Sequence, residues 1–487
     1  MSRHVSRVLP GAAFAAALVA CLEPALAAGP VPNKGDTAWM LTATVLVLLM
    51  TVPGLALFYA GLVRAKNVVS MLTQVLAIVC LVAIIWVVYG YSLAFTGGPL
   101  NSFFGGFSKA FLLGIGPDST TGTFSNGVVI PELVFVCFQM TFACITPALI
   151  IGGFAERMKF SALLLFIGLW VTFVYFPMAH MVWYWAGPDA LADAAKAAAA
   201  APGDAALKAK LEEVVADAGL IFSWGALDFA GGTVVHINSG IAALVGAIML
   251  GKRIGYKAEP MSPHSLTLTM VGAALLWVGW FGFNAGSALE SSAAALAFAN
   301  TFLATAAAGL TWAIVEFVFK WKFSLLGMAS GVVAGLVAIT PAAGFAGPIG
   351  ALILGAVAAI VCLFFCTVIK SLLGYDDSLD VFGIHAIGGI VGAIGTGLVV
   401  NPDWGGTGLV NDYTTKPGEV VAAAYDLTTQ VIAQAKGVGL TIVWCAIGSF
   451  IIFKIVDVVI GARVPADAEQ TGLDLATHGE RGYAYES

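Results

Sequence analysis

Two histidines stand inside stretches of the sequence that are apolar enough to cross a lipid bilayer. His236 lies in LDFAGGTVVHINSGIAALVGAIM and His385 in YDDSLDVFGIHAIGGIVGAIG. Ionisable side chains at membrane depth are costly, so they commonly mark a substrate path or a proton relay. A neutral imidazole donates at one ring nitrogen and accepts at the other, which suits it to bind a small polar solute and to pass on a proton. A single intramembrane histidine is equally well explained as a hydrogen-bonded packing residue.

The two stretches resemble each other, which favours a joint role for the histidines. Each runs from Leu-Asp through glycine to histidine, then to a glycine four residues later, and then to VGAI. His236 falls in the fifth apolar span and His385 in the tenth, so one helix is expected to run inward and the other outward. This pattern predicts an inverted repeat of five plus five helices with an eleventh added. The two histidines are then expected to meet near the membrane midplane.

Asp228 and Asp380 stand near the starts of the two histidine-bearing helices. Asp228 lies about two helical turns from His236, too far along the axis for direct contact. A carboxylate at a helix start accepts backbone N–H groups and is favoured by the helix dipole. We therefore expect Asp228, near the outer surface, and Asp380, near the inner surface, to have structural roles first.

Aromatic side chains gather in the spans around the histidines. The candidates are Phe138 and Phe142 on one face of the third span, Trp183 at the outer end of the fourth, and Trp280, Phe283 and Ser287 in the sixth. Any one of these rings is ordinarily explained by contact with lipid or by the interfacial aromatic belt. As a set they indicate a cation site, because aromatic faces attract ammonium-type ions and a serine hydroxyl can accept a hydrogen bond from the same ion.

The composition places the chain in a membrane. Of its 487 residues, 60% are hydrophobic and only 10% are charged, whereas a soluble globular protein has about 25% charged residues. The chain has no large basic cluster, which argues against nucleic acid as a partner. Apart from Cys21, the cysteines lie in apolar spans and are expected to be small buried side chains. Neither a disulfide framework, a metal site nor a cofactor is therefore predicted.

The first residues have the layout of a secretory signal. Arg3 and Arg7 precede a short apolar stretch, and ALA ends at Ala27, which predicts a cleavable signal peptide over residues 1–27. The alternative is lipoprotein processing at Cys21, because LVAC fits a lipid-attachment box. Both alternatives place the mature N-terminus outside the cytoplasm.

About eleven apolar spans follow the signal and predict an all-α integral membrane domain over residues 28–462. They begin near Thr37, Asn67, Gly127, Phe160, Gly225, Met261, Ala293, Phe323, Gly344, Val381 and Gly437. An odd number of spans places the tail, residues 463–487, in the cytoplasm. The distribution of lysine and arginine supports this orientation, because the outer loop 97–126 holds only Lys109. The expected inner loops hold Arg64, Lys66, Arg157, Lys159, Lys252, Arg253, Lys257, Lys320 and Lys322.

Two outer loops are longer than a helical bundle requires. Residues 188–219 are rich in alanine, carry more acidic than basic side chains and are interrupted by Pro202-Gly203. A solvated helical hairpin or a mobile insert is expected there, rather than a site. Residues 401–436 are polar and rich in turn residues, so a loop is predicted.

Several long motifs resemble the ammonium transporters of the Amt/Mep/Rh family. They are GLALFYAGLVRAKN, FACITPALIIGGFAERMKF, DFAGGTVVHINSGIAALVGA, GWFGFNAGS, DVFGIHAIGGIVGAI and the tail GLDLATHGERGYAYES, all between Thr37 and Ser487. The resemblance implies a transporter rather than an enzyme, in the bacterial inner membrane, with a periplasmic N-terminus. Its substrate would be ammonium or ammonia, with methylammonium as a further candidate. The resemblance also implies a homotrimer surrounded by membrane lipid, in which each protomer has its own narrow pore.

The resemblance implies roles for the residues singled out above. The outer recruitment site would comprise Phe138, Phe142, Trp183 and Ser287. Phe142 and Phe283 would stack and close the pore beneath that site. The pore would be lined by His236, His385, Trp280 and Thr340, with the two histidines sharing a hydrogen bond. Asp228 would order the outer vestibule, and the tail would dock on the cytoplasmic face, where a PII-type signalling protein can plug the pores.

The chain departs from the family pattern in two places. The insert 188–219 is longer than is usual between these helices. SPHS at Ser262–Ser265 stands where Pro-His-Asn is more usual, so the contacts of that inner loop are expected to differ.

The chemistry of these residues favours a separated transfer of ammonia and a proton. An ammonium ion would bind at the outer aromatic site and lose a proton, ammonia would cross the apolar pore, and the proton would follow through the histidines. A neutral ammonia channel and an ammonium sensor share the same pore and remain alternatives. A more remote alternative is a membrane redox protein in which His236 and His385 are axial haem ligands.

Overall fold

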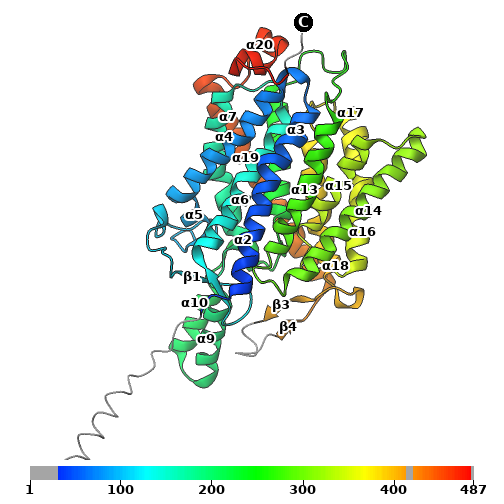
Figure 1. Cartoon of the computed structure of the whole chain (residues 1–487). Coiled ribbons are helices and arrows are strands. Elements are labelled where there is room, and N and C mark those ends of the chain that lie inside the picture. The colour runs from blue at the N-terminus through cyan, green and yellow to red at the C-terminus, as the bar shows by residue number, and fades with distance from the viewer. Residues whose placement is uncertain (1–30, 413–420, 484–487) are drawn as a thin grey trace, which may run out of the picture.

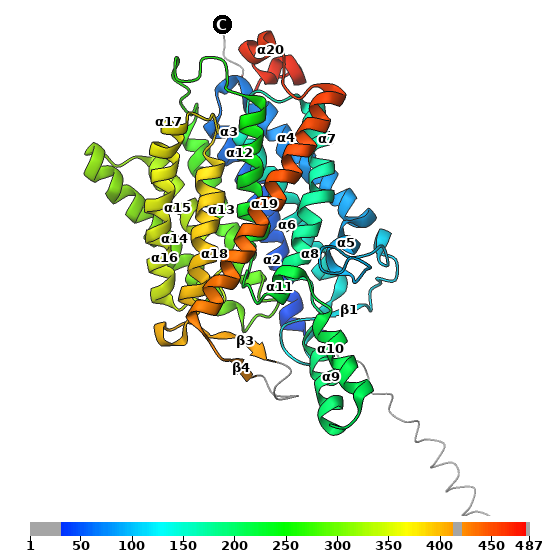
Figure 2. The same cartoon turned by 180° about the vertical axis from the view of Figure 1, so that it is seen from behind.

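The structure is a computed structural model that describes residues 31–412 and 421–483. It is a bundle of long, roughly parallel helices (Figures 1 and 2). We call the end of the bundle that bears α20 (Ala466–Thr471) the tail end, and the end that bears α9 (Pro188–Ala200) and α10 (Ala205–Ala216) the hairpin end. The predicted signal peptide 1–27, the alternative lipid site at Cys21 and the last four residues of the tail lie outside the described residues.

Eleven helical segments make up the bundle within the described ranges. Several of them contain a short π-helical or 3-10 turn between or before α-helical parts. Both kinds of turn are labelled η, and they are π-helical in this paragraph unless marked otherwise. In chain order they are α2 (Lys34–Leu49) with η1 (Met50–Leu55) and α3 (Ala56–Leu62), η2 (Ala65–Asn67, a 3-10 turn) with α4 (Val68–Ile85), η3 (Trp86–Gly90) and α5 (Tyr91–Phe95), α6 (Glu132–Ile150) with η5 (Ile151–Phe154, a 3-10 turn), α7 (Phe160–Trp170) with η6 (Val171–Tyr175) and α8 (Phe176–Trp183), η7 (Gly232–Ile237) with α12 (Asn238–Leu250), α13 (Leu266–Gly286), α14 (Ala294–Lys320), α15 (Leu325–Ile339), α16 (Pro348–Phe364) with η8 (Phe365–Ile369) and α17 (Lys370–Leu373), η9 (Phe382–Ala386) with α18 (Ile387–Val399), and α19 (Leu427–Ile460).

The remaining elements lie at the two ends of the bundle. At the hairpin end, β1 (Thr120–Gly122) pairs antiparallel with β2 (Val129–Pro131), and β3 (Leu409–Asp412) pairs antiparallel with β4 (Val421–Ala423). The other short elements are η4 (Ala110–Leu112), α11 (Leu220–Ser223), η10 (Pro402–Trp404) and, in the tail, η11 (Asp474–His478).

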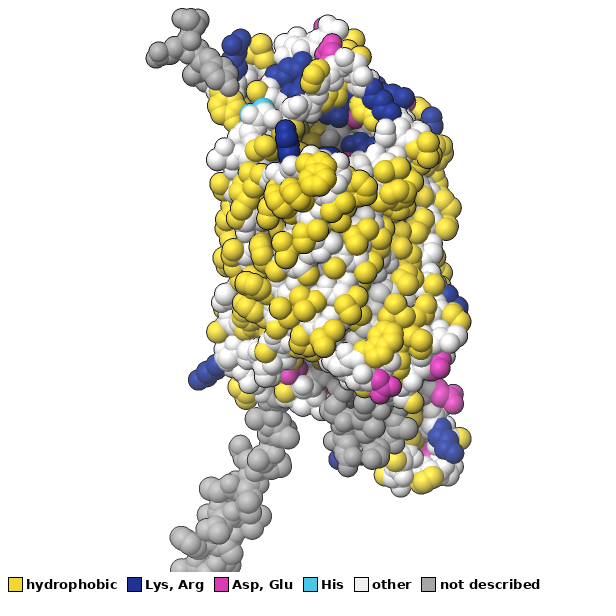
Figure 3. Space-filling view, turned by 90° about the vertical axis from the view of Figure 1, so that its right-hand side faces the viewer, with side chains coloured by type: hydrophobic (Ala, Val, Ile, Leu, Met, Phe, Trp, Pro, Cys, Tyr) yellow, Lys and Arg dark blue, Asp and Glu magenta, His cyan; other side chains and the backbone are white. Residues whose placement is uncertain are grey.

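The all-α class and the number of spans agree with the sequence. Ten of the segments in the described part of the chain are long and apolar enough to cross a membrane. α15 is shorter, but it packs against α13, α14, α16 and α18 and supplies the span expected near Phe323. An apolar band covers the face of the bundle that Figure 3 shows, and lysine and arginine side chains gather above it at the tail end. This is the surface that a lipid bilayer requires.

The last span begins ten residues earlier than predicted. α19 starts at Leu427 rather than near Gly437, because Asp426 caps it by accepting from the Thr429 amide at 2.7 Å. Two of the polar residues that suggested a loop, Gln430 and Gln434, are buried in the bundle. Gln430 donates to the Gly225 carbonyl at 2.9 Å, and Gln434 bonds to backbone groups of two neighbouring segments. Buried amides with satisfied hydrogen bonds are compatible with a spanning helix.

The insert 188–219 forms a helical hairpin, as one of the two expected alternatives. α9 and α10 pack against each other and project from the bundle (Figure 2). The two ends of the insert are fastened where they leave the bundle. Trp185 and Ala218 form an antiparallel bridge, and Asp217 accepts from the Tyr184 hydroxyl at 3.0 Å.

A buried chain of charges joins the loops at the tail end. The Arg64 Nε donates to the Glu156 carboxylate at 2.7 Å, and Arg253 lies 3.4 Å from the same carboxylate. Arg253 also donates to the Asp376 carboxylate from two nitrogens, at 2.9 and 2.8 Å. Arg157 lies 3.8 Å from the same carboxylate. Four loops that are far apart in sequence are thus tied together, which fixes where their helices begin and end.

The described part of the tail docks on this end of the bundle. Glu469 accepts from the Ile254 amide at 2.7 Å and from Arg463 at 2.8 Å. Asp474 accepts from the Ser70 amide at 2.7 Å, at the start of α4. In the unusual SPHS loop, His264 lies 2.9 Å from both the Val63 carbonyl and the Tyr483 hydroxyl. The tail is therefore bound to the helices rather than extended from them.

The charge chain predicts a stability loss in acid. Burial opposes ionisation of Glu156 and Asp376, but the adjacent arginines outweigh it and keep the pKa of each carboxyl below its ordinary value. A lowered folded-state pKa stabilises the protein above the unfolded pKa, about 4, and this contribution is lost as pH falls through the folded pKa. Asp376→Asn should therefore destabilise the protein by about 3–5 kcal/mol at pH 7, and by less at pH 3.

Thermal unfolding in one detergent, measured between pH 3 and pH 7, tests this prediction. The matched control is Glu213→Gln, which removes an exposed ion pair with Lys210 and should change stability by less than about 1 kcal/mol. An Asp376→Asn effect that is small at pH 7, or that grows in acid, would contradict the prediction.

Candidate functional site

The two histidines meet inside the bundle. His236 lies in η7 and His385 in η9, each in the π-helical turn that begins its span. Both side chains are buried, their Nδ1 atoms are 3.2 Å apart, and their ring centroids are 5.3 Å apart. π-helical turns are rare and often mark functional sites. The structure thus brings together the two residues that the repeated motif singled out.

The hydrogen bond between the rings fixes what they present to a solute. Because the two Nδ1 atoms face each other, one must donate and the other must accept. In a neutral pair, the accepting ring therefore carries its proton on Nε2, while the donating ring has a bare Nε2. The Nε2 atom of His236 is buried and has no hydrogen-bond partner among the described residues. The pair can thus offer one donor and one acceptor to a small polar molecule.

Two glycines allow this close approach. Gly240 and Gly389 each stand four residues after a histidine. A Cβ at Gly240 would lie 2.3 Å from the amide nitrogen of Ala386, in η9, and a Cβ at Gly389 would lie 2.9 Å from the Gly232 carbonyl oxygen, in η7. Each histidine-bearing helix therefore receives the π-helical turn of the other at a position where only a hydrogen atom fits.

A continuous column of aromatic rings leads from the histidines toward the hairpin end. The Phe283 centroid lies 5.9 Å from that of His236, and Phe283 stacks on Phe142 at 4.2 Å and 23°. Trp183 meets Phe142 edge-on, at 5.8 Å and 90°. Phe142 and Phe283 are buried, whereas Trp183 is half-buried. The column thus begins at a partly accessible ring and ends at the histidine pair.

Phe138 and Ser287 lie beside the stacked pair Phe142 and Phe283. Phe138 packs against Phe142 at 5.0 Å and 63°. The Ser287 hydroxyl donates to the Phe283 carbonyl at 2.9 Å, which leaves its lone pairs available as acceptors. Trp183 donates its indole N–H to the Asp228 carbonyl at 3.0 Å. Aromatic faces and a free hydroxyl acceptor at one place suit a small ammonium-type cation.

Trp280 packs beside the His236 ring and is itself hydrogen-bonded to Thr340. The Trp280 ring lies 5.4 Å from the His236 ring at an angle of 23°. Its indole N–H donates to the Thr340 hydroxyl at 2.9 Å, and that hydroxyl donates to the Leu336 carbonyl at 2.8 Å. Both side chains are buried and their donors are engaged. Trp280 therefore orients the His236 ring, and Thr340 fixes the Trp280 indole.

Asp228 organises the start of η7. Its Oδ1 accepts from the Gly231 and Gly232 amides at 2.8 and 2.6 Å, and its Oδ2 accepts from the Thr233 amide at 2.8 Å and from the Thr233 hydroxyl. A weaker bond from Val234 is 3.3 Å long. The carboxylate therefore satisfies the unpaired donors of the helix start, which is the role expected from its position.

Asp380 is not the counterpart of Asp228, and the pairing made from sequence is wrong in this respect. Asp380 bonds to Lys370 at 2.6 Å and has a positive φ of 60°. The carboxylate that caps the second histidine helix is Asp377, which accepts from the Phe382 amide at 2.7 Å. Asp377 stands eight residues before His385, as Asp228 stands eight before His236. Equal spacing to the histidines was the signal that would have identified Asp377.

Gln434 was also missed by the sequence analysis. Its side chain accepts from the Leu227 amide at 2.5 Å and donates to the Leu227 and Ala393 carbonyls at 2.8 and 2.7 Å. It thereby ties α19 to the loop that holds Asp228 and to α18. Nothing in the local sequence distinguishes this glutamine from a polar loop residue.

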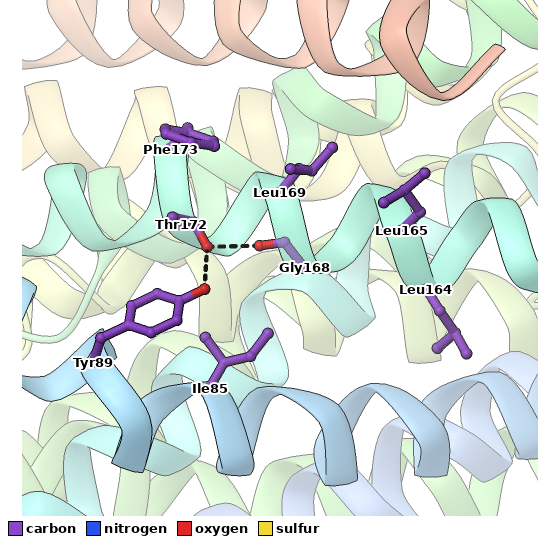
Figure 4. Close-up of a pocket in the computed structure, with 8 residues that line it drawn as sticks. All are labelled: Ile85, Tyr89, Leu164, Leu165, Gly168, Leu169, Thr172 and Phe173. Carbon is purple, nitrogen blue, oxygen red and sulfur yellow. Dashed lines mark hydrogen bonds between the residues drawn. The ribbon is translucent and has the colours of Figure 1, made fainter. Parts of the chain in front are cut away.

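A separate groove lies on the outside of the bundle, between α4–η3 and α7–η6 (Figure 4). It has a volume of about 360 Å³, and its polar groups include the hydroxyls of Tyr89 and Thr172, which bond to each other at 2.9 Å. Phe173 at its rim is exposed. None of the aromatic-column or histidine residues lines this groove, so it is not part of the site.

Comparisons with known proteins agree on one family. A model of the Ammonium Transporter Family matches residues 38–483. The chain is 43% identical to an ammonium transporter of Aquifex aeolicus over 93% of its own length and 94% of that relative. It is equally identical to an ammonium transporter of Bacillus subtilis, over 93% and 99% of the two chains. The crystal structure of Candida albicans Mep2 matches with a TM-score of 0.73 and 32% identity, over 90% of this chain and 87% of that one.

The close packing at Gly240 predicts that an added side chain there destabilises the protein. Gly240→Ala should force η9 and α12 apart, weaken the contact between the histidines and destabilise the protein by about 1–3 kcal/mol, because the added Cβ would meet backbone. The control is Gly439→Ala in α19, where a Cβ would meet nothing within 4 Å. Thermal unfolding of the two variants in one detergent checks this, and equal stability of the two would contradict it.

Proposed function

Since this chain belongs to the ammonium transporter family, we propose that it transports ammonium by separated transfer. An ammonium ion binds at the Trp183 end of the aromatic column and loses a proton there. Ammonia then passes Phe142 and Phe283 to reach the histidines, and the proton follows by way of the His236–His385 pair. The observation that carries this proposal is the direct Nδ1–Nδ1 hydrogen bond at the base of the column.

The energetics favour deprotonation before passage. An isolated ammonium ion in an apolar interior is unfavourable by tens of kcal/mol in the idealised limit. The cation–π interaction in a desolvated aromatic site stabilises the bound ion by only about 2 kcal/mol. The aromatic residues and the Ser287 hydroxyl therefore suit binding of the ion at the mouth, whereas the buried stack of Phe142 and Phe283 suits the neutral molecule. Potassium has no proton to lose, so the same barrier rejects it.

The histidine geometry suits ammonia as the passing species. Ammonia both donates and accepts hydrogen bonds, and the neutral pair offers one acceptor and one donor at Nε2. A haem between the rings does not fit this geometry, because two metal–imidazole bonds of about 2.0–2.1 Å each need about 4 Å between the nitrogens. The Nδ1 atoms are 3.2 Å apart and already bonded to each other.

The orientation follows from the distribution of charge. Lysine and arginine side chains gather at the tail end (Figure 3), so this end faces the cytoplasm by the positive-inside rule. The hairpin end and the mouth of the aromatic column then face the periplasm of a bacterial inner membrane. The protein is a homotrimer in this proposal, and a PII-type protein binds at the tail end. Native mass spectrometry of the detergent-solubilised protein, alone and with a purified PII protein, tests both assemblies.

The first experiment is the current in proteoliposomes on a solid-supported membrane after an ammonium jump. The wild type should give a current, and His236→Ala combined with His385→Ala should abolish it, because the double variant has no imidazole to carry the proton. Liposomes without protein and a potassium jump are the controls, and Gly439→Ala tests the effect of a substitution away from the pore. Methylammonium in place of ammonium tests the second substrate.

Each result discriminates among the mechanisms. A wild-type current that the double variant lacks supports proton movement at the histidines. A current that survives in the double variant but admits potassium makes the histidines a selectivity filter and overturns their role as a proton path. Ammonia influx without current in the wild type makes the protein a neutral channel and overturns separated transfer.

A further inference from the structure

The two carboxylates that cap the histidine helices are hydrogen-bonded unequally. Both oxygens of Asp228, at the hairpin end, accept from backbone amides. Asp377, at the tail end, accepts from the Phe382 amide through Oδ2, while its Oδ1 is buried and has no partner among the described residues. The Asp377 side chain is only 1% exposed. An unpaired carboxylate oxygen in such a position is unfavourable when ionised, and protonation relieves it.

Most of the charged and titratable groups near Asp377 bond to other partners. Lys370 bonds to Asp380, and the Tyr59 hydroxyl donates to the Leu149 carbonyl at 2.9 Å. The Arg157 guanidinium donates through its terminal nitrogens to Ser378 and to the Gly153 and Asp376 carbonyls, while its buried Nε has no partner among the described residues. The Cys366 thiol and the Tyr375 hydroxyl lie close enough to Asp377 to interact with it electrostatically. None of these groups supplies a hydrogen bond to Oδ1.

Burial raises the pKa of Asp377 to about 6, and Asp380 adds to this effect, whereas Lys370 and the backbone hydrogen bonds oppose it. Asp377 can therefore change protonation state near the pH of a cell interior. It also stands at the start of the helix that carries His385, eight residues away. Residues 377–380 form the turn that leads into η9, so Asp377 lies on the tail-end side of the histidine pair.

We propose that Asp377 is the carboxylate that receives the proton from the histidine pair and releases it at the tail end. This inference rests on the separated transfer proposed above. The proton leaves the imidazolium of the pair, is carried by water in the pore to Oδ1 and converts the carboxylate to a carboxylic acid. Dissociation to the solution at the tail end restores the carboxylate. No electrons are exchanged, and ammonia crosses separately.

Asp377→Asn tests this inference, because the amide oxygen still accepts from the Phe382 amide but the side chain cannot hold an exchangeable proton as an acid. Current after an ammonium jump and ammonia influx, followed by the internal pH, are measured on the same proteoliposomes. We expect the current to fall at least fivefold while ammonia influx stays within twofold of wild type. Asp377→Glu, which retains a carboxyl group, should restore current.

The wild-type current should also decline as the pH on the tail side falls below about 6, because Asp377 is then already protonated.

The matched control is Asp426→Asn, which makes the same substitution at the exposed N-cap of α19 and should leave the current unchanged. Unchanged current in Asp377→Asn overturns the inference. A parallel fall of current and influx that Glu does not rescue also overturns it, since it marks a purely structural cap. Absence of current in the wild type is a different failure, because it defeats separated transfer itself and the role of Asp377 with it.

Discussion

The site depends on one close approach between two helices that start from opposite ends of the bundle. Gly240 and Gly389 let each helix receive the π-helical turn of the other, with no room for a side chain at either contact. This crossing leaves His236 and His385 bonded to each other in an apolar interior. A hydrogen bond that is sheltered from water is strong, and breaking it leaves unpaired polar groups. The histidine positions are therefore fixed by backbone packing before any substrate is considered.

The rest of the structure serves to hold this crossing in place. Asp228 and Asp377 satisfy the backbone donors where the two helices begin, at opposite ends of the bundle. Gln434 fastens the loop of Asp228 to α18 and α19, and the chain of charges around Arg253 and Asp376 fixes the loops at the tail end. The polar groups thus lie mainly at helix starts and loops, where backbone hydrogen bonds would otherwise be missing. The interior between them stays apolar, which is the condition that separates a neutral molecule from an ion.

Much of this arrangement could be predicted because it follows from periodic or repeated patterns in the amino-acid sequence. Apolar length identified the spans, and the shared Leu-Asp to histidine motif identified both histidines and their inverted relation. Two predictions were wrong because the features they concern depend on tertiary contacts. The start of α19 was misplaced because Gln430 and Gln434 look like loop residues until their buried backbone partners are known. Asp380 was chosen over Asp377 because the Leu-Asp dipeptide was matched instead of the distance to the histidine. Local identity was a weaker guide than spacing from the functional residue.

The Nδ1–Nδ1 geometry also limits how the pair can carry a proton. A proton that arrives at the bare Nε2 of the donating ring makes that ring cationic, and the ring then passes its Nδ1 proton to its partner. The partner releases the proton from its own Nε2. After this passage the first ring accepts and the second donates, so the two tautomers have been exchanged. A second proton cannot follow in the same direction until the rings return to their original tautomers. In the proposed separated transfer, the pair would therefore pass protons one at a time, and the return of the rings to their original tautomers would set an upper limit on the rate of the current.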